Sequence, residues 1–330
     1  MTTMNDVARL AGVSRGTVSN YINGVKIKAE SQKKVQAAID ELGYIPNLTA
    51  RNLKKSRSDL VALILPTTQS PFFSELVFTL QQVLKKQNFK TILCNSNNDI
   101  SEELEYLQMA KEQKVAGIIT ISYSELPVNL LQGVNIVSIE KKLSATIPCV
   151  SVENSVGGRM AAAELTKRGA DKLLVISRKT DKTVFNYGQR VGGFTSYCEK
   201  EQVEYSVFNP ELHDDRFYGE LGEFLDNEFK NLGVNGIFAV SDQYADFVYR
   251  KLSANGYKIP EDVQIIGFDG SKMYPQQPAL LSSIRQPVEL IAEKCVWQLM
   301  AILRGDDIDK KQITFIPVTF IEGNTTKKTN

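Results

Sequence analysis

Short apolar segments alternate with helical stretches from residue 59 to the end of the chain, and this alternation constrains the fold most. The apolar segments form two successive sets, at 60–66, 90–95, 117–122, 135–140 and 149–153, and then at 172–177, 236–242 and 263–269. Helical stretches between most of them are typical of parallel sheets with helices on both faces. We therefore predict an α/β body, residues 59–330, made of two doubly wound parallel-sheet lobes.

Polar residues stand directly after several of the predicted strands. They are Asn95, Ser122, Glu140, Ser241, Asp242 and Asp269. Open α/β sheets bind ligands at the carboxyl ends of their strands, so two facing lobes create a binding cleft there. Asn, Ser and Asp are also common as helix caps and loop residues, which is the alternative for each one alone. Their recurrence at equivalent strand ends favours a ligand site.

Residues 1–46 predict a small, separate all-α domain. Thr3 begins a capping-box pattern, and the short helix that follows ends at Gly12. Ser14 is a suitable N-cap for a second helix, and a third helix is expected at about residues 29–42. Two helices joined by a glycine-containing turn match the helix-turn-helix pattern.

Charge is distributed unevenly along the chain. Residues 1–58 contain ten Lys and Arg against four Asp and Glu, a net charge of +6, whereas residues 59–330 contain 29 against 34, a net charge of −5. A basic domain on a mildly acidic body is typical of a nucleic-acid-binding module joined to a part that does not touch nucleic acid. A three-helix interaction module with an incidentally basic surface is the alternative.

No catalytic or metal-binding pattern stands out. The only histidine, His213, has no nucleophile signature beside it, and the chain contains neither a P-loop nor a G-x-G-x-x-G motif. The four cysteines form no C-x-x-C pair. No apolar run approaches the roughly 18 residues of a membrane helix, and the chain does not begin with a signal sequence. We therefore expect a soluble, cytoplasmic protein that is not an enzyme and uses no metal, cofactor or membrane.

The sequence MNDVARLAGVSRGTVSNYIN, followed by VQAAIDELGYIPN, resembles the DNA-binding domain of the lac repressor and gal repressor family of bacterial transcription regulators. By this resemblance Arg15, Gly16 and Asn20 occupy the positions that read base edges in the major groove. Arginine can pair with guanine and asparagine with adenine, whereas Gly16 has no side chain with which to read a base. The positions that resemble phosphate contacts are Thr3, Ser14, Thr17, Ser19 and Asn23.

Residues 47–58, NLTARNLKKSRS, link the two predicted parts. They are too few for a stable isolated helix, which needs roughly 12 to 15 residues. The A-R-x-L-K pattern resembles the hinge helix of the same family, which folds on DNA and lies in the minor groove. By that resemblance Leu53 inserts between base pairs, Ala50 packs beside it, and Lys54 supports the phosphate contacts. A plain basic tether is the alternative.

The body resembles the effector domain of this family, which is similar in fold to periplasmic sugar-binding proteins. The segment SPFF implies that Phe72 or Phe73 forms an apolar wall for a ligand ring. The segment GQRVGGF implies that Arg190 binds an effector oxygen, with an ion pair closing the lobes as its alternative role. GFDG gives Asp269 as an acceptor for sugar hydroxyls, although Gly270 replaces the second aspartate of the family pattern.

The segment IRQP places Gln286 where the chain crosses back to the first lobe. The predicted first lobe is about 59–153 and 288–316, and the second is about 154–285 and 317–330.

The resemblance implies a sequence-specific transcriptional regulator that binds a pseudo-palindromic operator as a homodimer. We expect a repressor of carbohydrate-utilisation genes that a sugar or sugar-phosphate effector releases from DNA, since carboxylates and arginine bind hydroxyl-rich rings through charge-assisted hydrogen bonds. A purine effector and a phosphoprotein corepressor stay open as alternatives. A periplasmic solute receptor and an enzyme of sugar metabolism are the rival classes.

Overall fold

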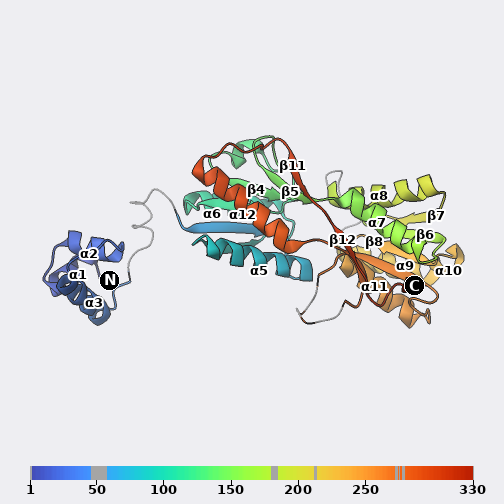
Figure 1. Cartoon of the computed structure of the whole chain (residues 1–330), viewed down its shortest axis with the longest axis horizontal. Helices are drawn as coiled ribbons and strands as arrows, with labels where there is room; N and C mark the ends of the chain where they lie inside the picture. Colours follow the sequence, from blue (N-terminus) through green and yellow to red (C-terminus); the bar gives the residue numbers. More distant parts are fainter. Residues whose placement is uncertain are drawn as a thin grey trace. The chain divides into compact units, whose positions relative to one another are not determined.

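The computed structural model describes residues 2–45, 58–179, 185–211, 214–271, 274, 276 and 279–329. The three predicted minor-groove residues, Ala50, Leu53 and Lys54, lie outside the described residues. The chain forms two compact units, Met1–Asp59 and Leu60–Asn330 (Figure 1). We call the first unit the head and the second the body.

The head contains three helices, α1 (Met4–Ala11), α2 (Arg15–Ile22) and α3 (Ala29–Leu42). The predicted third helix has the bounds that the structure gives. Gly12 takes a φ of 61° where α1 ends, a conformation that suits glycine because it has no Cβ. Apolar residues of the three helices and the segment after α3 enclose one small core, formed by Val7, Ala8, Ala11, Val18, Val35, Ala38 and Tyr44.

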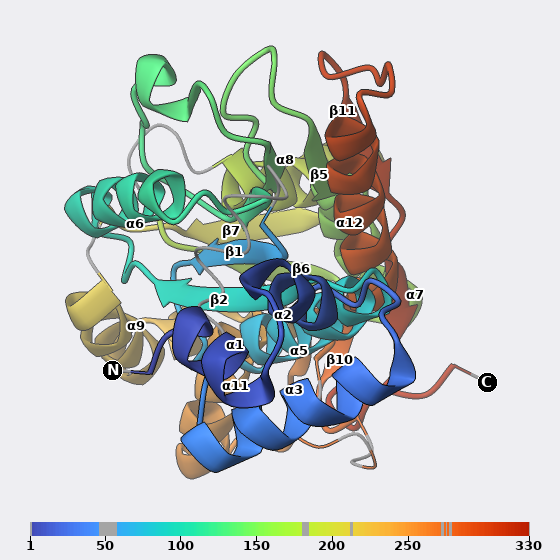
Figure 2. The same cartoon turned by 90° about the vertical axis from the view of Figure 1, so that its left-hand side faces the viewer.

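The first sheet of the body is parallel, with the strand order β11-β5-β4-β3-β1-β2. Its strands are β1 (Leu60–Leu65), β2 (Lys90–Asn95), β3 (Gly117–Thr120), β4 (Ile136–Ile139), β5 (Cys149–Val152) and β11 (Ile313–Ile316). The helices around it are α5 (Pro71–Lys86), α6 (Ile100–Glu112), a 3-10 helix (Val128–Leu131) and α12 (Val288–Arg304). Helices α5 and α6 lie on opposite faces of β1 and β2 (Figure 2). We call this layered unit lobe 1.

The second sheet has the strand order β12-β10-β9-β8-β6-β7, and only β12 is antiparallel to its neighbour. Its strands are β6 (Lys172–Ile176), β7 (Glu204–Phe208), β8 (Gly236–Ala239), β9 (Gln264–Asp269), β10 (Ser282–Arg285) and β12 (Thr319–Ile321). The helices of this lobe 2 are α7 (Asn154–Lys167), α8 (Phe185–Glu201), α9 (Asp214–Asn227), α10 (Phe229–Leu232) and α11 (Asp242–Ala254). The two doubly wound lobes and the all-α head confirm the predicted fold class.

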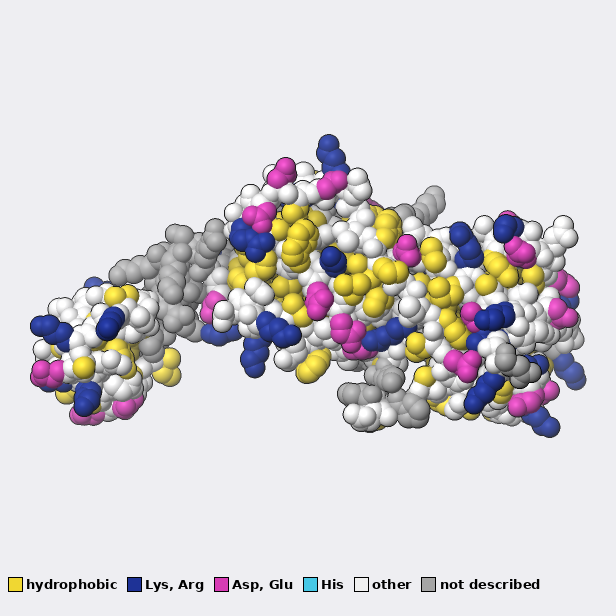
Figure 3. All heavy atoms as spheres, viewed as in Figure 1, with side chains coloured by type: hydrophobic (Ala, Val, Ile, Leu, Met, Phe, Trp, Pro, Cys, Tyr) yellow, Lys and Arg dark blue, Asp and Glu magenta, His cyan; other side chains and the backbone are white. Residues whose placement is uncertain are grey.

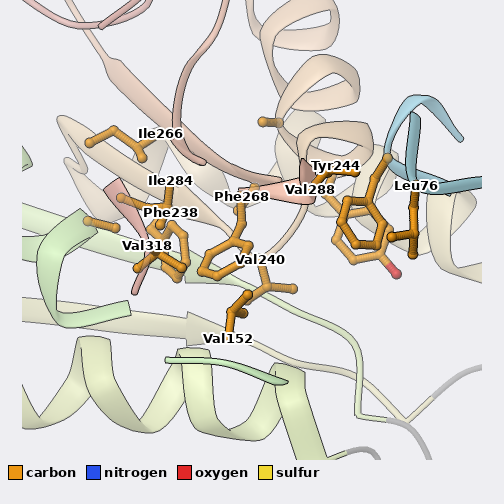
Figure 4. Packing of buried hydrophobic residues seen from close by; sticks show 14 of the residues in the cluster. Leu76, Val152, Phe238, Val240, Tyr244, Ile266, Phe268, Ile284, Val288 and Val318 are labelled. Atoms are coloured by element: carbon orange, nitrogen blue, oxygen red, sulfur yellow. The ribbon is translucent and has the colours of Figure 1, made fainter. Parts of the chain in front are cut away.

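The chain passes between the lobes after β5, after β10, and between β11 and β12. One cluster of buried apolar side chains runs through both lobes. Figure 4 shows Phe268 beside Phe238 and near Val240, all of lobe 2, with Val152 of lobe 1 next to Val240. This shared core fixes the strand ends of the two lobes against each other.

Four strands, β7, β10, β11 and β12, are absent from the prediction, which contains the other eight. Three of them are edge strands whose residues are mostly half-buried or exposed, so they have no continuous apolar run. The fourth, β10, is buried but has the polar sequence SSIR. Among the described residues, no helix has the length and apolar character needed to cross a membrane.

Candidate functional site

Helix α2 presents a polar surface away from the core of the head. Val18 is fully buried, whereas Arg15, Gly16 and Asn20 are exposed. Within the described part of the chain, neither Arg15 nor Asn20 has an ion pair or a side-chain hydrogen bond. Their donors are therefore available to a ligand outside the chain.

The other candidate residues of the head form local hydrogen bonds. The Ser14 hydroxyl accepts from the backbone N–H of Thr17 at 3.1 Å, and the side chain of Asn23 donates to the carbonyl of Ser19 at 2.7 Å. The hydroxyl of Thr3 donates to the carboxylate of Asp6 at 2.7 Å and lowers the pKa of that carboxyl. These contacts fix the helix ends that a phosphate contact would use.

Arg190 of α8 is the centre of the polar cluster in the body. Its side chain is only 3% exposed, and its guanidinium lies 3.5 Å above the ring of Phe268. Nε donates to Oδ1 of Asn154 and Nη1 donates to the carbonyl of Val240, both at 2.7 Å. Nη1 also lies 3.8 Å from Oδ1 of Asp269. A buried guanidinium with these partners is rigidly oriented.

Glu140, at the end of β4 in lobe 1, is joined to Arg190 through Asn154. The Nδ2 group of Asn154 donates to Oε2 of Glu140 at 2.9 Å, while Oδ1 of the same amide accepts from Arg190. Asn154 begins α7 two residues after the end of β5. It is close to a strand end, as the other candidates are, but the sequence patterns missed it. It links strand ends of the two lobes.

Asp269 and Gln286 complete this group, which we call the interlobe cluster: Glu140, Asn154, Arg190, Asp269 and Gln286. The amide of Gln286 donates to Oδ1 of Asp269 at 2.7 Å, and its Oε1 is a buried acceptor with no hydrogen-bond partner among the described residues. Burial raises the pKa of Asp269 to about 6, although the charge of Arg190 opposes this rise.

Asp242 lies beside the cluster, at the start of α11. Its carboxylate accepts from the backbone N–H of Gly270 at 2.8 Å and from the hydroxyl of Ser283 at 2.6 Å. Burial, together with the nearby charge of Asp269, raises its pKa well above the ordinary value. Tyr123 and Asn186, which the sequence patterns missed, also adjoin the cluster, and burial raises the pKa of the Tyr123 phenol.

The remaining candidates of the body make contacts outside the interlobe cluster. Ser122 donates to the buried carboxylate of Glu103, and Ser241 caps α11 by accepting from the backbone of Tyr244 at 3.3 Å. Asn95 donates to Thr68 at 3.3 Å, and its Oδ1 is buried with no hydrogen-bond partner in the part of the chain that the structure describes. Phe72 belongs to the buried core, which leaves the half-buried Phe73 as the more accessible ring.

An ion pair joins the two lobes, but Arg285 makes it and Arg190 does not. The guanidinium of Arg285 in β10 binds both carboxylate oxygens of Glu75 in α5, one of them at 2.9 Å. It also donates to the carbonyl of Gly270 at 3.2 Å. A Cβ at position 270 would lie 2.8 Å from Cα of Arg285, which explains why a glycine stands here in place of the second aspartate.

Comparison with known proteins identifies the family. A family model described as "bacterial regulatory proteins, lacI family" matches residues 3–47, and a model of a periplasmic binding protein-like domain matches residues 162–326. A sucrose operon repressor from Streptococcus mutans is 35% identical, over 97% of this chain and 98% of its own length. The chain belongs to the lacI family of bacterial regulatory proteins.

Solved structures share the fold of this lacI-family chain. A periplasmic binding protein/LacI transcriptional regulator from Alkaliphilus metalliredigens, complexed with D-xylulofuranose, is 27% identical with a TM-score of 0.71, over 82% of this chain and 100% of its own. A lac repressor dimer bound to operator and the anti-inducer ONPF has a TM-score of 0.82 at 20% identity, over 98% of this chain and 99% of its own, which shows the fold alone. The chain is thus a DNA-binding transcriptional regulator with a helix-turn-helix head and a periplasmic-binding-protein-like body.

The raised pKa of Asp269 gives this lacI-family body a specific pH dependence. A carboxyl with a pKa of about 6 when folded and 3.8 when unfolded costs stability above about pH 6, and that cost disappears as the pH falls towards 4. Asp269→Asn removes the cost, so we expect it to raise the free energy of unfolding by about 2 kcal/mol near pH 8. The gain should vanish near pH 4 in urea denaturation. A gain that is equal at both pH values would contradict the assignment.

Proposed function

We propose that this regulator represses carbohydrate-utilisation genes and that a sugar or sugar-phosphate effector releases it from its operator. The observation that carries the proposal is the interlobe cluster, in which Glu140 and Asp269, at strand ends of the two lobes, meet Arg190 of α8. The unpartnered Oε1 of Gln286 adds an acceptor that a ligand hydroxyl would satisfy. Glu140 and Asp269 both hold positive φ values, 69° and 116°, a strain that is common at ligand sites.

The relatives support a carbohydrate as the effector class. The Streptococcus mutans protein is named a sucrose operon repressor, and the Alkaliphilus metalliredigens protein is complexed with D-xylulofuranose. By analogy, Phe73 would provide the apolar wall, and Asn95, Ser122 and Ser241 would lie at its margin. We propose no catalytic activity, and we place the regulator in the cytoplasm, where its operator lies.

In the head, Arg15 and Asn20 of α2 are the proposed base-reading residues. Both are exposed, and their side chains form no hydrogen bond or ion pair within the described part of the chain. Thr3, Ser14, Thr17, Ser19 and Asn23 would contact phosphates, and Gly16 would allow close approach to the groove. Because one head offers few base contacts, we propose a homodimer that binds a pseudo-palindromic operator.

Replacing Arg15 with alanine should relax specificity at one base pair of each half-site. A bidentate contact between arginine and guanine is worth about 1–3 kcal/mol of discrimination, so the preference for that base should fall by roughly 10-fold or more. Binding of a randomised operator library to the variant and the wild type measures this preference. A loss that is equal for all sequences would instead identify Arg15 as a phosphate contact.

We propose that the effector changes the angle between lobe 1 (about 59–153 and 288–316) and lobe 2 (about 154–285 and 317–330). This change would prevent the linkers, residues 47–58, from folding together in the minor groove. Since the two equilibria are linked, effector and operator must weaken each other by the same factor.

The test is a thermal-shift screen of the full chain with sugars, sugar phosphates and purines, because a ligand of the folded body raises the melting temperature. Each ligand that raises it is then added to an operator complex selected from random DNA. Release by a sugar or sugar phosphate supports the proposal. A response to purines alone, a dependence on a phosphoprotein from extract, or turnover of a sugar would contradict it.

A further inference from the structure

Lysines gather at the edge of lobe 1 where the polypeptide enters the body from the linker. Leu60, the first residue of β1, pairs in register with Lys90, the first residue of β2. The carbonyl of Leu60 accepts from the backbone N–H of Ala116 at 2.7 Å, two residues after Lys114. The lysines of this edge are Lys85, Lys86, Lys90, Lys111 and Lys114, and we call them the linker edge.

The lysines of the linker edge lie in three layers of lobe 1, the sheet and the helices on its two faces. Lys85 and Lys86 end α5 on one face of the sheet, Lys111 lies in the last turn of α6 on the opposite face, and Lys90 lies in the sheet between them. In the segments 58–60, 84–90 and 110–117, the only acidic residues are Asp59 and Glu112, which leaves a net charge of +3. Figure 3 shows Lys and Arg side chains at this end of lobe 1.

Three of these five lysines are exposed and have no ion-pair partner among the described residues. The side chains of Lys85, Lys86 and Lys114 are exposed, and within the described residues none of the three forms an ion pair. Lysine near a helix C-terminus is common because it interacts favourably with the helix dipole. Lys114 stands at the same end of α6, directly after its C-cap, and takes a φ of 50°.

Lobe 2 provides an internal comparison, since its sheet has the same winding. The residues equivalent to Leu60 and Lys90 are Lys172 and Glu204, which also pair in register but form an ion pair of 2.6 Å. Arg168 and Lys200, near the same edge of lobe 2, are also paired, with Glu164 and Glu201. Lys167, Lys230 and Lys258 of that edge form no ion pair within the described residues. The first residues of β1 and β2 cannot form such an ion pair with each other, because Leu60 carries no charge.

We propose that the linker edge of lobe 1 binds the phosphate backbone of duplex DNA without reading its sequence. The chain between the DNA-binding head and this edge continues the same charge, because residues 47–58 contain Arg51, Lys54, Lys55 and Arg57 and no acidic residue. An ammonium group is a point charge that suits phosphate oxygens, and such contacts position a protein on DNA independently of base sequence. The proposal rests on DNA binding by the head and extends the interface to the body.

The test compares two triple variants of the full chain that remove the same charge. The first replaces Lys85, Lys86 and Lys114 with glutamine, and the second, a matched control, replaces the exposed lysines Lys167, Lys230 and Lys258 of lobe 2. Binding to a random-sequence DNA duplex is measured over a range of salt concentrations. Each phosphate contact contributes about 0.9 to the slope of log K against log salt, so the slope of the first variant should fall by roughly 1 to 3.

The expected result is a smaller slope and weaker binding for the linker-edge variant, with the control equal to the wild type. Equal changes in both variants would show a general effect of net charge and would overturn the proposal, as would no change in either. Wild-type protein that fails to bind any DNA would instead contradict the function of the head. Surface Lys→Gln changes alter stability little, so thermal melting should be the same for all three proteins.

Discussion

Replacing Gly193 with alanine is expected to lower the free energy of unfolding by about 3 kcal/mol. A Cβ at this position would lie 1.9 Å from the carbonyl oxygen of Ser155, which belongs to the backbone of α7. The crossing is reciprocal, because a Cβ at Gly158 of α7 would lie 1.9 Å from the carbonyl oxygen of Arg190 in α8. The two helices thus meet backbone to backbone, and a methyl group forces them apart. Urea denaturation followed by circular dichroism measures the loss.

The adjacent Gly192 is the matched control. It lies in the same helix, is exposed, and would have no atom within 4 Å of an added Cβ. Alanine is favoured over glycine in a helix, so Gly192→Ala should raise the free energy of unfolding by about 0.5–1 kcal/mol. Opposite signs at neighbouring positions are the expected outcome. If both substitutions stabilise the protein, the helices do not cross as closely as described.

Replacing Arg190 with methionine should cost about 3–5 kcal/mol near neutral pH, as expected when one partner of a buried charge cluster is removed. The carboxylate of Asp269 would lose the opposing charge 3.8 Å away, and Oδ1 of Asn154 would lose its donor. The variant should also lose its response to any sugar that stabilises the wild type. Urea denaturation and thermal shift measure the two effects.

The pH dependence of this variant separates charge from packing. Without Arg190 the pKa of Asp269 should rise further above 6, so protonation should restore part of the stability as the pH falls towards 5. The double variant Arg190→Met with Asp269→Asn should recover a similar part near neutral pH, since it removes the uncompensated charge. A loss that neither acid nor the second substitution reduces would show that packing alone accounts for it.

The sequence predicts the inner strands of both sheets well, because a strand covered on both faces must be continuously apolar. It misses β10, whose serines are buried through hydrogen bonds. The backbone N–H of Ser282 donates to the hydroxyl of Thr325 at 2.9 Å, and the hydroxyl of Ser283 donates to the carboxylate of Asp242. These partners come from distant parts of the chain, so a polar run such as SSIR carries no local sign that it is buried.

The interlobe cluster likewise has a part that the sequence predicts and a part that it does not. Its strand-end positions are predictable because polar residues that follow buried strands are visible in the sequence, as for Glu140 and Asp269. The contacts are not predictable, since Asn154 joins Glu140 to Arg190 only when two lobes and a helix start meet. Likewise, Arg285 and Glu75 form the ion pair between the lobes, and no sequence pattern predicted either residue for this role.

The sequence by itself determines the helix-turn-helix head, the two wound lobes and the family, because helix caps, apolar periodicity and contiguous motifs are local properties of the chain. Only the tertiary structure decides which charges neutralise one another. Lys172 of lobe 2 pairs with Glu204, whereas Lys85, Lys86 and Lys114 of lobe 1 form no ion pair among the described residues, and Gly193 is required because α7 and α8 cross there. Both depend on distances between residues far apart in sequence, which packing sets and local pattern does not.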